Sequence, residues 1–245
     1  MRVLLLGGTA EARELAARLY PRIEVVSSLA GRVPDPVLPV GPVRVGGFGG
    51  VDGLRRWLHD NGIEAVIDAT HPFSATMTAN AAQVCAQLRL PHVVLNRPPW
   101  DPVGAAVVSS DTAAAEHIAA QGYSRVFLTT GRSGTAAFRD SAAWFLIRVV
   151  TAPDAADLPR AHELLVSRGP YDHDGERALL TRHRIEALVT KNSGGDLTRA
   201  KLDAARELGI AVVMIARPAL PSGVQVVDTV EAAQAWTLSR DNAGV

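Results

Sequence analysis

The chain has 245 residues, enough for one large domain or two small ones, and it is 47% hydrophobic but only 5% aromatic. Its 25 basic residues equal its 25 acidic residues, which argues against a protein that coats nucleic acid. The single cysteine, Cys85, excludes an internal disulfide and a cysteine-rich metal site. No leader precedes the first apolar run, and no apolar run approaches the ~18 residues that a membrane span needs. We therefore expect a cytoplasmic protein without a membrane or a nucleic-acid partner.

Apolar runs alternate with helical stretches along the whole chain. The first run, "RVLLLG", is followed by a helix near residues 10–20 and then by "IEVVSS". The stretch "VDGLRRWLHDNG" leads into "IEAVIDAT", and "TANAAQVCAQL" leads into "PHVVLNRP". This alternation predicts an α/β fold with a doubly wound parallel sheet.

The second half of the chain repeats the first at a separation of roughly 120 residues. "IEAVIDATHPF" matches "IEALVTKNSGG", and "RVLLLGG" matches "RVFLTTG". The alternative is that all such strand–helix units look alike. We predict two Rossmann-like halves with parallel sheets, related by internal duplication, with an active-site cleft between them.

The boundary between the halves has two readings. Pro98, Pro99 and Pro102 mark a linker, which predicts an N-terminal domain over residues 1–98 and a C-terminal domain over residues 99–245. The repeat instead ends the first unit near Gln121. The readings agree if the closing strand and helix of each half pack onto the other half.

Ligands of open parallel sheets bind beyond the carboxyl ends of the strands. After the first strand, a glycine pair lets a backbone approach a phosphate, and a threonine caps the next helix, whose first amides then point at the anion. Glycine turns also serve packing alone, and the full G-x-G-x-x-G pattern is absent. The cofactor-binding residues that we expect here are Gly7, Gly8, Thr9, Ala10, Glu11, Ala12 and Arg13.

The end of the second strand indicates which cofactor binds. NAD-binding folds place an acidic residue there for the ribose hydroxyls, whereas this chain has Ser28 and, further on, Arg32. A carboxylate repels a 2′-phosphate, but a hydroxyl and a guanidinium bind it. The pair favours NADPH over NADH, with a solvated surface arginine as the alternative for Arg32.

The loop "DATHPF" adds Thr70 and His71 at the edge of the same sheet. Thr70 is assigned to cofactor binding. A histidine in this place can donate a proton near neutral pH, hydrogen-bond a ribose or an amide, or cap the loop. No second histidine, cysteine or acid follows at ligand spacing, so we expect no metal.

The second half offers loops that combine hydroxyls, glycines and one cation each. Two such loops at matched positions suggest an anionic substrate, and "SRGPY" belongs to the same set of strand-end loops. The substrate-binding residues that we expect are Thr130, Gly131, Arg132, Ser133, Arg168, Lys191, Asn192, Ser193 and Gly194, with Tyr171 beside them.

Taken together, these segments resemble the precorrin-6A reductase family of corrin ring synthesis. The resemblance rests on "LLGGTAEAREL", "GRVP", "GGFGG", "DATHPFSATMTANA", "NRPPW", "LTTGR", "SRGPY" and "TKNSGG", and on "KLDAARELGIAVVMIARP". It covers nearly the whole chain, and the combination of "DATHPF" with "TKNSGG" is its most specific part.

The resemblance implies a hydride from NADPH to a ring carbon of a corrinoid precursor in cobalamin biosynthesis, with a proton added to the neighbouring carbon. The precursor carries many carboxylates, which Arg132, Arg168, Lys191 and Arg217 would bind. His71, Lys191 and Tyr171 are the candidate proton donors. The resemblance leaves open a metal-free or a cobalt-containing substrate, and the oligomeric state stays open, with a monomer compatible.

Other functions fit parts of the pattern. An NADPH-dependent reductase of another small anionic substrate would keep the roles of Ser28 and Arg32. A non-catalytic nucleotide-binding protein would bind NADPH without oxidising it. A transferase of nucleotide sugars or S-adenosylmethionine is disfavoured by the missing acid after the second strand.

Overall fold

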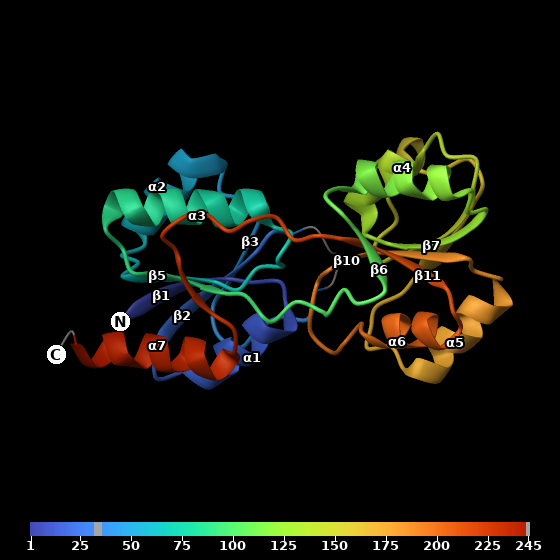
Figure 1. Ribbon diagram of the computed structural model, residues 1–245. Helices are drawn as coiled ribbons and strands as arrows, with labels where there is room; N and C mark the ends of the chain where they lie inside the picture. Colours follow the sequence, from blue (N-terminus) through green and yellow to red (C-terminus); the bar gives the residue numbers. More distant parts are fainter. Residues whose placement is uncertain (32–35, 244–245) are drawn as a thin grey trace. The chain divides into compact units, whose positions relative to one another are not determined.

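Two six-stranded parallel sheets organise the chain, and each is covered by helices (Figure 1). The computed structural model describes residues 1–31 and 36–243. It divides into a first unit of residues 1–98 with 218–245 and a second unit of residues 99–217. The predicted α/β class with two parallel sheets is confirmed.

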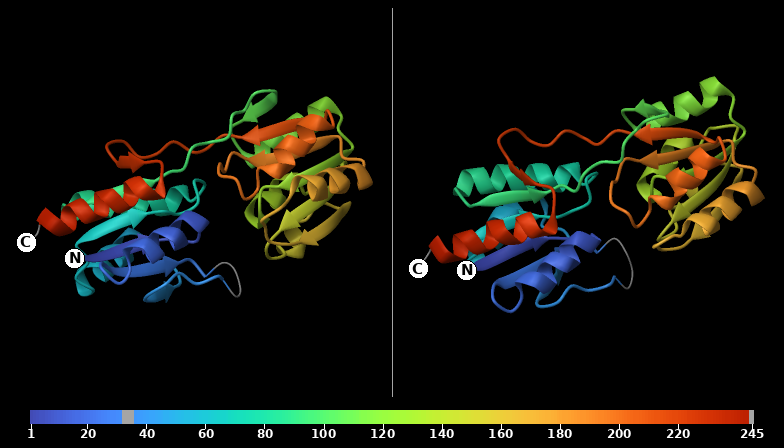
Figure 2. Two further views of the ribbon diagram at one scale, coloured as in Figure 1. Left: turned by 90° about the horizontal axis from the view of Figure 1, so that it is seen from below. Right: turned by 60° about the horizontal axis from the view of Figure 1, so that its bottom comes forward.

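The first unit has the strand order β12-β5-β4-β1-β2-β3. Its side chains alternate between the two faces: Val3 and Leu5 pack under α1 and α7, and Leu4 and Leu6 pack under α2 and α3. In both views of Figure 2, α7 runs alongside α1. The elements are β1 (Arg2–Leu6), α1 (Ala10–Leu19), β2 (Glu24–Leu29), β3 (Val43–Val45), α2 (Gly50–Asp60), β4 (Ala65–Asp68), α3 (Ala75–Leu88), β5 (His92–Leu95), β12 (Gln225–Val227) and α7 (Val230–Ala243).

The second unit has the order β6-β11-β10-β7-β8-β9. Helices α5 and α6 contact each other, as do α4 and the 3-10 helix η1. The elements are β6 (Ala105–Val108), α4 (Asp111–Gln121), β7 (Arg125–Thr129), η1 (Arg132–Phe138), β8 (Trp144–Val149), η2 (Ala155–Asp157), β9 (His162–Val166), α5 (His173–Arg182), β10 (Ala187–Lys191), α6 (Ala200–Glu207) and β11 (Ala211–Ile215).

One edge strand of each sheet is the closing strand of the other half of the sequence repeat. In the first sheet, β12 pairs with β5, and in the second sheet β6 pairs with β11. The second unit therefore ends at Arg217 rather than at the C-terminus. Counted within its own unit, the first sheet has the Rossmann order 3-2-1-4-5-6, and the second has the order 4-3-2-5-6-1 because its edge strand β6 comes first in the chain.

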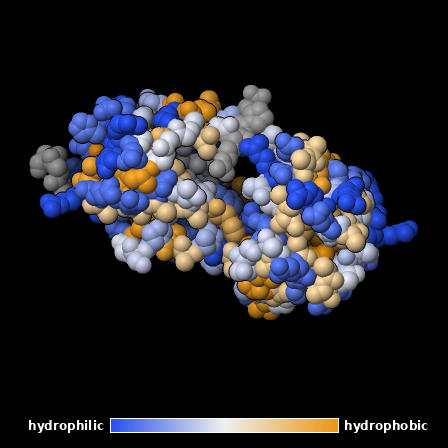
Figure 3. Space-filling view, turned by 90° about the horizontal axis from the view of Figure 1, so that it is seen from above, coloured by the Kyte–Doolittle hydropathy of each residue, from blue (hydrophilic) through white to orange (hydrophobic). Residues whose placement is uncertain are grey.

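One face of each unit is coloured by hydropathy in Figure 3. Hydrophilic residues are spread over the visible face of each unit, and the strongly apolar residues form small groups (Figure 3). No helix in the described part of the chain is long and apolar enough to cross a membrane.

Candidate active site

In the first unit, the strand order reverses between β1 and β4, and open α/β sheets bind ligands beside such a reversal. Thr9 joins the two loops that leave these strands. Its Oγ1 donates to the carbonyl of Ala69 over 2.8 Å and accepts from the Ala12 amide over 3.1 Å. One side chain thus fixes both the start of α1 and the end of β4.

The glycine turn leaves fewer free amides than the sequence predicts. The Gly7 amide donates to the carbonyl of Ser28 over 2.9 Å, and the Ala12 amide is taken by Thr9. Gly8 has a φ of +110°, which favours glycine, and no described atom lies within 4 Å of the position of a Cβ there. A phosphate can therefore approach Gly8 and the first amides of α1, those of Ala10 and Glu11, which have no partner within a helix.

A guanidinium reaches the start of α1 from the end of β5. Arg97 Nη1 lies 2.7 Å from Oε2 of Glu11, and both side chains are mostly buried. The Glu11 carboxylate in the first turn also interacts favourably with the helix dipole. Glu11 therefore positions Arg97 beside the glycine turn. Arg13, which lies one turn into α1, is half-buried.

Ser28 is paired with a cation that the sequence reasoning missed. Arg44 is its register partner between β2 and β3, and Arg44 Nη1 donates to Ser28 Oγ over 3.3 Å. The guanidinium also donates to the carbonyls of Gly46 and Gly47, and it stacks on the Phe48 ring at 3.7 Å. Because Ser28 Oγ accepts from Arg44, its own hydrogen is left for a ligand. The pair can bind a phosphate at the end of the second strand.

Arg32, the cation expected at this place, lies outside the described residues. The sequence signal for Arg44 is a charged residue inside the short apolar strand "VRV", which is unusual for a half-buried position. The same signal, an arginine in "FLIRVV", marks Arg148 of the second unit.

Asp68 ends β4, and Thr70 and His71 follow in the loop after it. Asp68 Oδ1 accepts from the Thr70 amide over 3.0 Å and from Thr70 Oγ1 over 2.7 Å. His71 Nδ1 accepts from the Phe73 amide over 3.3 Å, which leaves the proton of the neutral ring on Nε2. Both Thr70 and His71 are half-buried, so a ligand can reach them.

In the second unit the strand order reverses between β7 and β10, and Lys191 joins the loops there. Its Nζ donates to the carbonyl of Thr130 over 2.8 Å and lies 3.6 Å from Oδ2 of Asp111, at the start of α4. Lys191 thus holds three elements together, and its charge is partly balanced by Asp111.

The turn after β7 is open at Gly131 and closely packed at Gly134. A Cβ on Gly134 would lie 2.3 Å from Asp111 Oδ1 and 2.4 Å from Thr130 Oγ1. Gly131, Arg132 and Ser133 are exposed, and the segment that they begin is a seven-residue 3-10 helix rather than an α-helix. Of this group, Arg132 has the exposed charge that a carboxylate ligand needs.

Asn192 holds a neighbouring segment. Its side chain accepts from the Trp100 amide over 2.8 Å and donates to the Trp100 carbonyl over 3.0 Å, and it is 9% exposed. Arg217 donates to the carbonyls of Asn192 and Ser193 over 2.8 and 3.0 Å. Asn192 therefore supports this loop, which continues through the buried Gly194.

Tyr171 lies on a buried group of charges between β8, α5 and α6. The Arg148 guanidinium lies 3.9 Å from the centre of the Tyr171 ring and 2.6 Å from Oε1 of Glu176. Burial, together with Arg148, lowers the pKa of Lys201 to about 8. The Tyr171 hydroxyl lies 3.1 Å from Oγ of Ser167. The neighbouring Arg168 is exposed to solvent.

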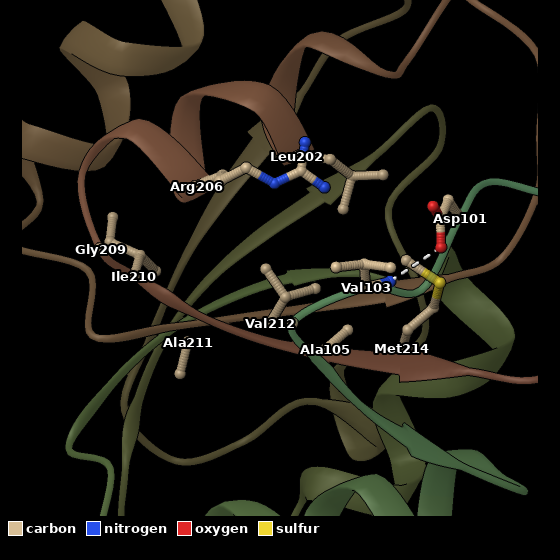
Figure 4. A pocket seen from close by; sticks show the side chains of 11 residues that line it. Asp101, Val103, Ala105, Leu202, Arg206, Gly209, Ile210, Ala211, Val212 and Met214 are labelled. Carbon is tan, nitrogen blue, oxygen red and sulfur yellow. Dashed lines mark hydrogen bonds between the residues drawn. The ribbon is translucent and has the colours of Figure 1, made fainter.

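A cavity of about 290 Å³ in the second unit lies apart from these loops (Figure 4). It lies between α6, the edge strand β6 and its neighbour β11, and most of its lining residues are apolar, with Asp101 and Arg206 at its sides. None of the candidate residues lines it. In the described part of the chain, no group of three or more histidine, cysteine or acidic residues is placed to hold a metal ion.

The Rossmann strand order and the glycine turn at the reversal define a nucleotide-binding α/β protein. The model of the precorrin-6x reductases CbiJ/CobK matches residues 2–238, so the chain belongs to the precorrin-6x reductase family. It is an oxidoreductase of cobalamin biosynthesis that acts on a carbon–carbon double bond of the corrin ring precursor and needs a reduced nicotinamide cofactor. The resemblance found in the sequence is confirmed.

Named relatives match over almost their full length. The chain is 68% identical over 235 residues to a precorrin-6A reductase of Mycobacterium tuberculosis, covering 96% of each chain. It is 52% identical over 250 residues to a precorrin-6A reductase of Rhodococcus erythropolis, covering 98% of this chain and 99% of the relative. A solved structure of CobK precorrin-6A reductase is 39% identical, with a TM-score of 0.89 over 98% of this chain and 96% of that chain.

Proposed function

We propose that the protein uses NADPH to reduce a ring double bond of precorrin-6A. One ring carbon gains a hydride from C4 of the nicotinamide, the neighbouring carbon gains a proton, and NADP⁺ leaves. The pairing of Ser28 with Arg44 is the observation that carries the choice of NADPH, because a hydroxyl and a fixed guanidinium suit a 2′-phosphate.

The first unit would hold the cofactor. Gly8 and the first amides of α1 would face the pyrophosphate, and Arg97 adds a cation nearby. Bound NADPH supplies the reducing power, and the protein contributes orientation and the exclusion of water.

The second unit would hold the carboxylates of the macrocycle. Arg132 and Arg168 are exposed and can form bidentate contacts with carboxylates. Arg217 is held in place by the carbonyls of Asn192 and Ser193. Lys191 contributes by fixing the loops through its contacts with Thr130 and Asp111.

His71 is the candidate to test first among the three possible proton donors, His71, Lys191 and Tyr171. The Phe73 amide at Nδ1 leaves Nε2 as the donor atom of the His71 ring. The Lys191 ammonium is already bound by Thr130 and Asp111, and the Tyr171 hydroxyl lies within hydrogen-bond distance of Ser167.

The experiment follows NADPH absorbance with and without precorrin-6A, with NADH in parallel. We expect substrate-dependent oxidation of NADPH and little oxidation of NADH. Oxidation only with cobalt-precorrin-6A would mean that the substrate is the cobalt-containing compound. Binding of NADPH without oxidation by either compound would contradict the proposed reaction. His71→Asn should lower turnover by roughly 10²-fold or more with NADPH affinity unchanged, and full activity of this variant would remove His71 from the mechanism.

A further inference from the structure

Asp68 ends β4 beside the strand reversal of the first unit, and it is almost fully buried at 1% exposure. Its Oδ1 accepts both the amide and the hydroxyl hydrogen of Thr70, over 3.0 and 2.7 Å. Its Oδ2 has no hydrogen-bond partner among the described residues. Burying a carboxylate costs free energy, and two hydrogen bonds from one residue offset only part of that cost. The presence of Asp68 at this place therefore needs an explanation.

These two hydrogen bonds decide the polarity of the Thr70 hydroxyl. The Thr70 amide can only donate, so the oxygen that it meets, Asp68 Oδ1, is an acceptor. The Thr70 hydroxyl shares this oxygen and therefore also donates to it. Its hydrogen points at Asp68, and its lone pairs are left for whatever lies beyond the strand end.

The strand order indicates which part of a dinucleotide lies there. In a sheet of this order, the pyrophosphate lies at the start of α1 and the adenosine ribose lies at the end of β2. β4 flanks β1 on the side opposite to β2. The end of β4 therefore faces the nicotinamide half of the cofactor.

We infer that Thr70 accepts a hydrogen bond from an N–H or O–H group on the nicotinamide half of the cofactor, and that Asp68 is the positioning residue that turns the hydroxyl for it. This inference rests on the proposed binding of NADPH by the first unit. Two groups supply the required donor, the carboxamide of the nicotinamide and the hydroxyls of its ribose. A phosphate does not fit, because its oxygens would meet the lone pairs of Thr70 and the charge of Asp68.

The test compares Thr70→Val, which has nearly the same shape but no hydroxyl, with Thr70→Ser, which keeps it. Thr76→Val, an exposed threonine on α3, is the matched control. Calorimetry measures the dissociation constants of NADP⁺, of its 3-acetylpyridine analogue, which lacks the amide N–H, and of 2′-phospho-ADP-ribose, which lacks the ring. No substrate is added, so the readout is independent of turnover.

Thr70→Val is expected to lower the affinity for NADP⁺ by roughly tenfold, while the affinities of Thr70→Ser and Thr76→Val stay within about twofold of the wild type. If the carboxamide is the donor, Thr70→Val leaves the affinity of the other two ligands unchanged. If the ribose is the donor, all three ligands weaken. Asp68→Asn, whose amide oxygen is a weaker acceptor, is expected to shift the affinities in the same direction by a smaller factor.

The inference is overturned if Thr70→Val binds all three ligands as the wild type does. That result differs from a failure of the proposed function, in which the wild type itself binds none of them.

Discussion

At the residue scale, the proposed selectivity for NADPH depends on a cation that is distant in the sequence from its partner serine. Sixteen positions separate Ser28 from Arg44, and only the register of β2 with β3 brings them together. Register depends on long-range pairing, which a single sequence does not reveal. The serine and the missing acid were therefore predictable, whereas the position of the guanidinium was not.

Arg44→Gln should weaken NADPH by roughly tenfold or more, because a charge-assisted contact to the 2′-phosphate is lost. NADH lacks that phosphate, so its affinity should change by about twofold or less. Fluorescence titration of both cofactors measures the ratio. Arg56→Gln, an exposed arginine on α2, is the control. Equal losses for NADPH and NADH would contradict the role of Arg44.

At the element scale, the two strand reversals use similar positions in different ways. In the first unit, a glycine turn leads into the ten-residue helix α1, whereas in the second unit the corresponding turn leads into η1. The repeat predicted equivalent anion sites in both halves. Gly131 is as open as Gly8, whereas Gly134 packs against Thr130 and Asp111; this packing depends on α4, which spacing alone does not reveal.

Gly134→Ala should destabilise the protein by about 1–3 kcal/mol, because the added methyl overlaps Asp111 Oδ1 and Thr130 Oγ1 in a packed turn. Urea unfolding measures the change. Gly47→Ala, where no described atom lies within 4 Å of the added Cβ, should be close to neutral. Equal stability of the two variants would show that the turn after β7 is not packed as described.

The buried charges between β8, α5 and α6 predict a pH dependence. Burial lowers the pKa of Lys201 to about 8 in the folded protein, below its ordinary value. Between these values the unfolded chain binds more protons, so this lysine makes the free energy of unfolding rise with pH. Burial also raises the pKa of Cys85 to about 12, which acts in the opposite direction.

The measured quantity is therefore the difference in unfolding free energy between the wild type and Lys201→Met, from pH 7 to 10. Above pH 8, the free energy of unfolding of the wild type should rise relative to that of Lys201→Met. A difference that does not change with pH would mean that Lys201 has an ordinary pKa.

At the scale of the whole molecule, the strand–helix alternation and the internal repeat predicted two parallel sheets, and the structure has them. The sequence indicates which segments are strands because buried parallel strands are continuous apolar runs. The partner of an edge strand is less accessible, since β5 and β12 are separated by the entire second unit. The cofactor and substrate roles of the two units remain predictions.

Trp236→Ala should lower the stability of the first unit by about 3–5 kcal/mol, because Trp236 of α7 packs in one core cluster with Val3 and Leu5 of β1. Hydrogen exchange should report lost protection in residues 1–98 and 218–243. Phe138→Ala, fully buried in the second unit, should affect residues 99–217 instead. Loss of protection in the second unit on Trp236→Ala would contradict the assignment of α7.

The central claim, that a nicotinamide cofactor delivers a hydride to the macrocycle, is tested most directly by isotope transfer. NADPH deuterated at C4, on each face in turn, is incubated with precorrin-6A, and the product mass is compared with that from unlabelled NADPH. We predict that one of the two labelled cofactors adds a single deuterium and that the second hydrogen comes from solvent. A product without deuterium from either cofactor would contradict direct hydride transfer.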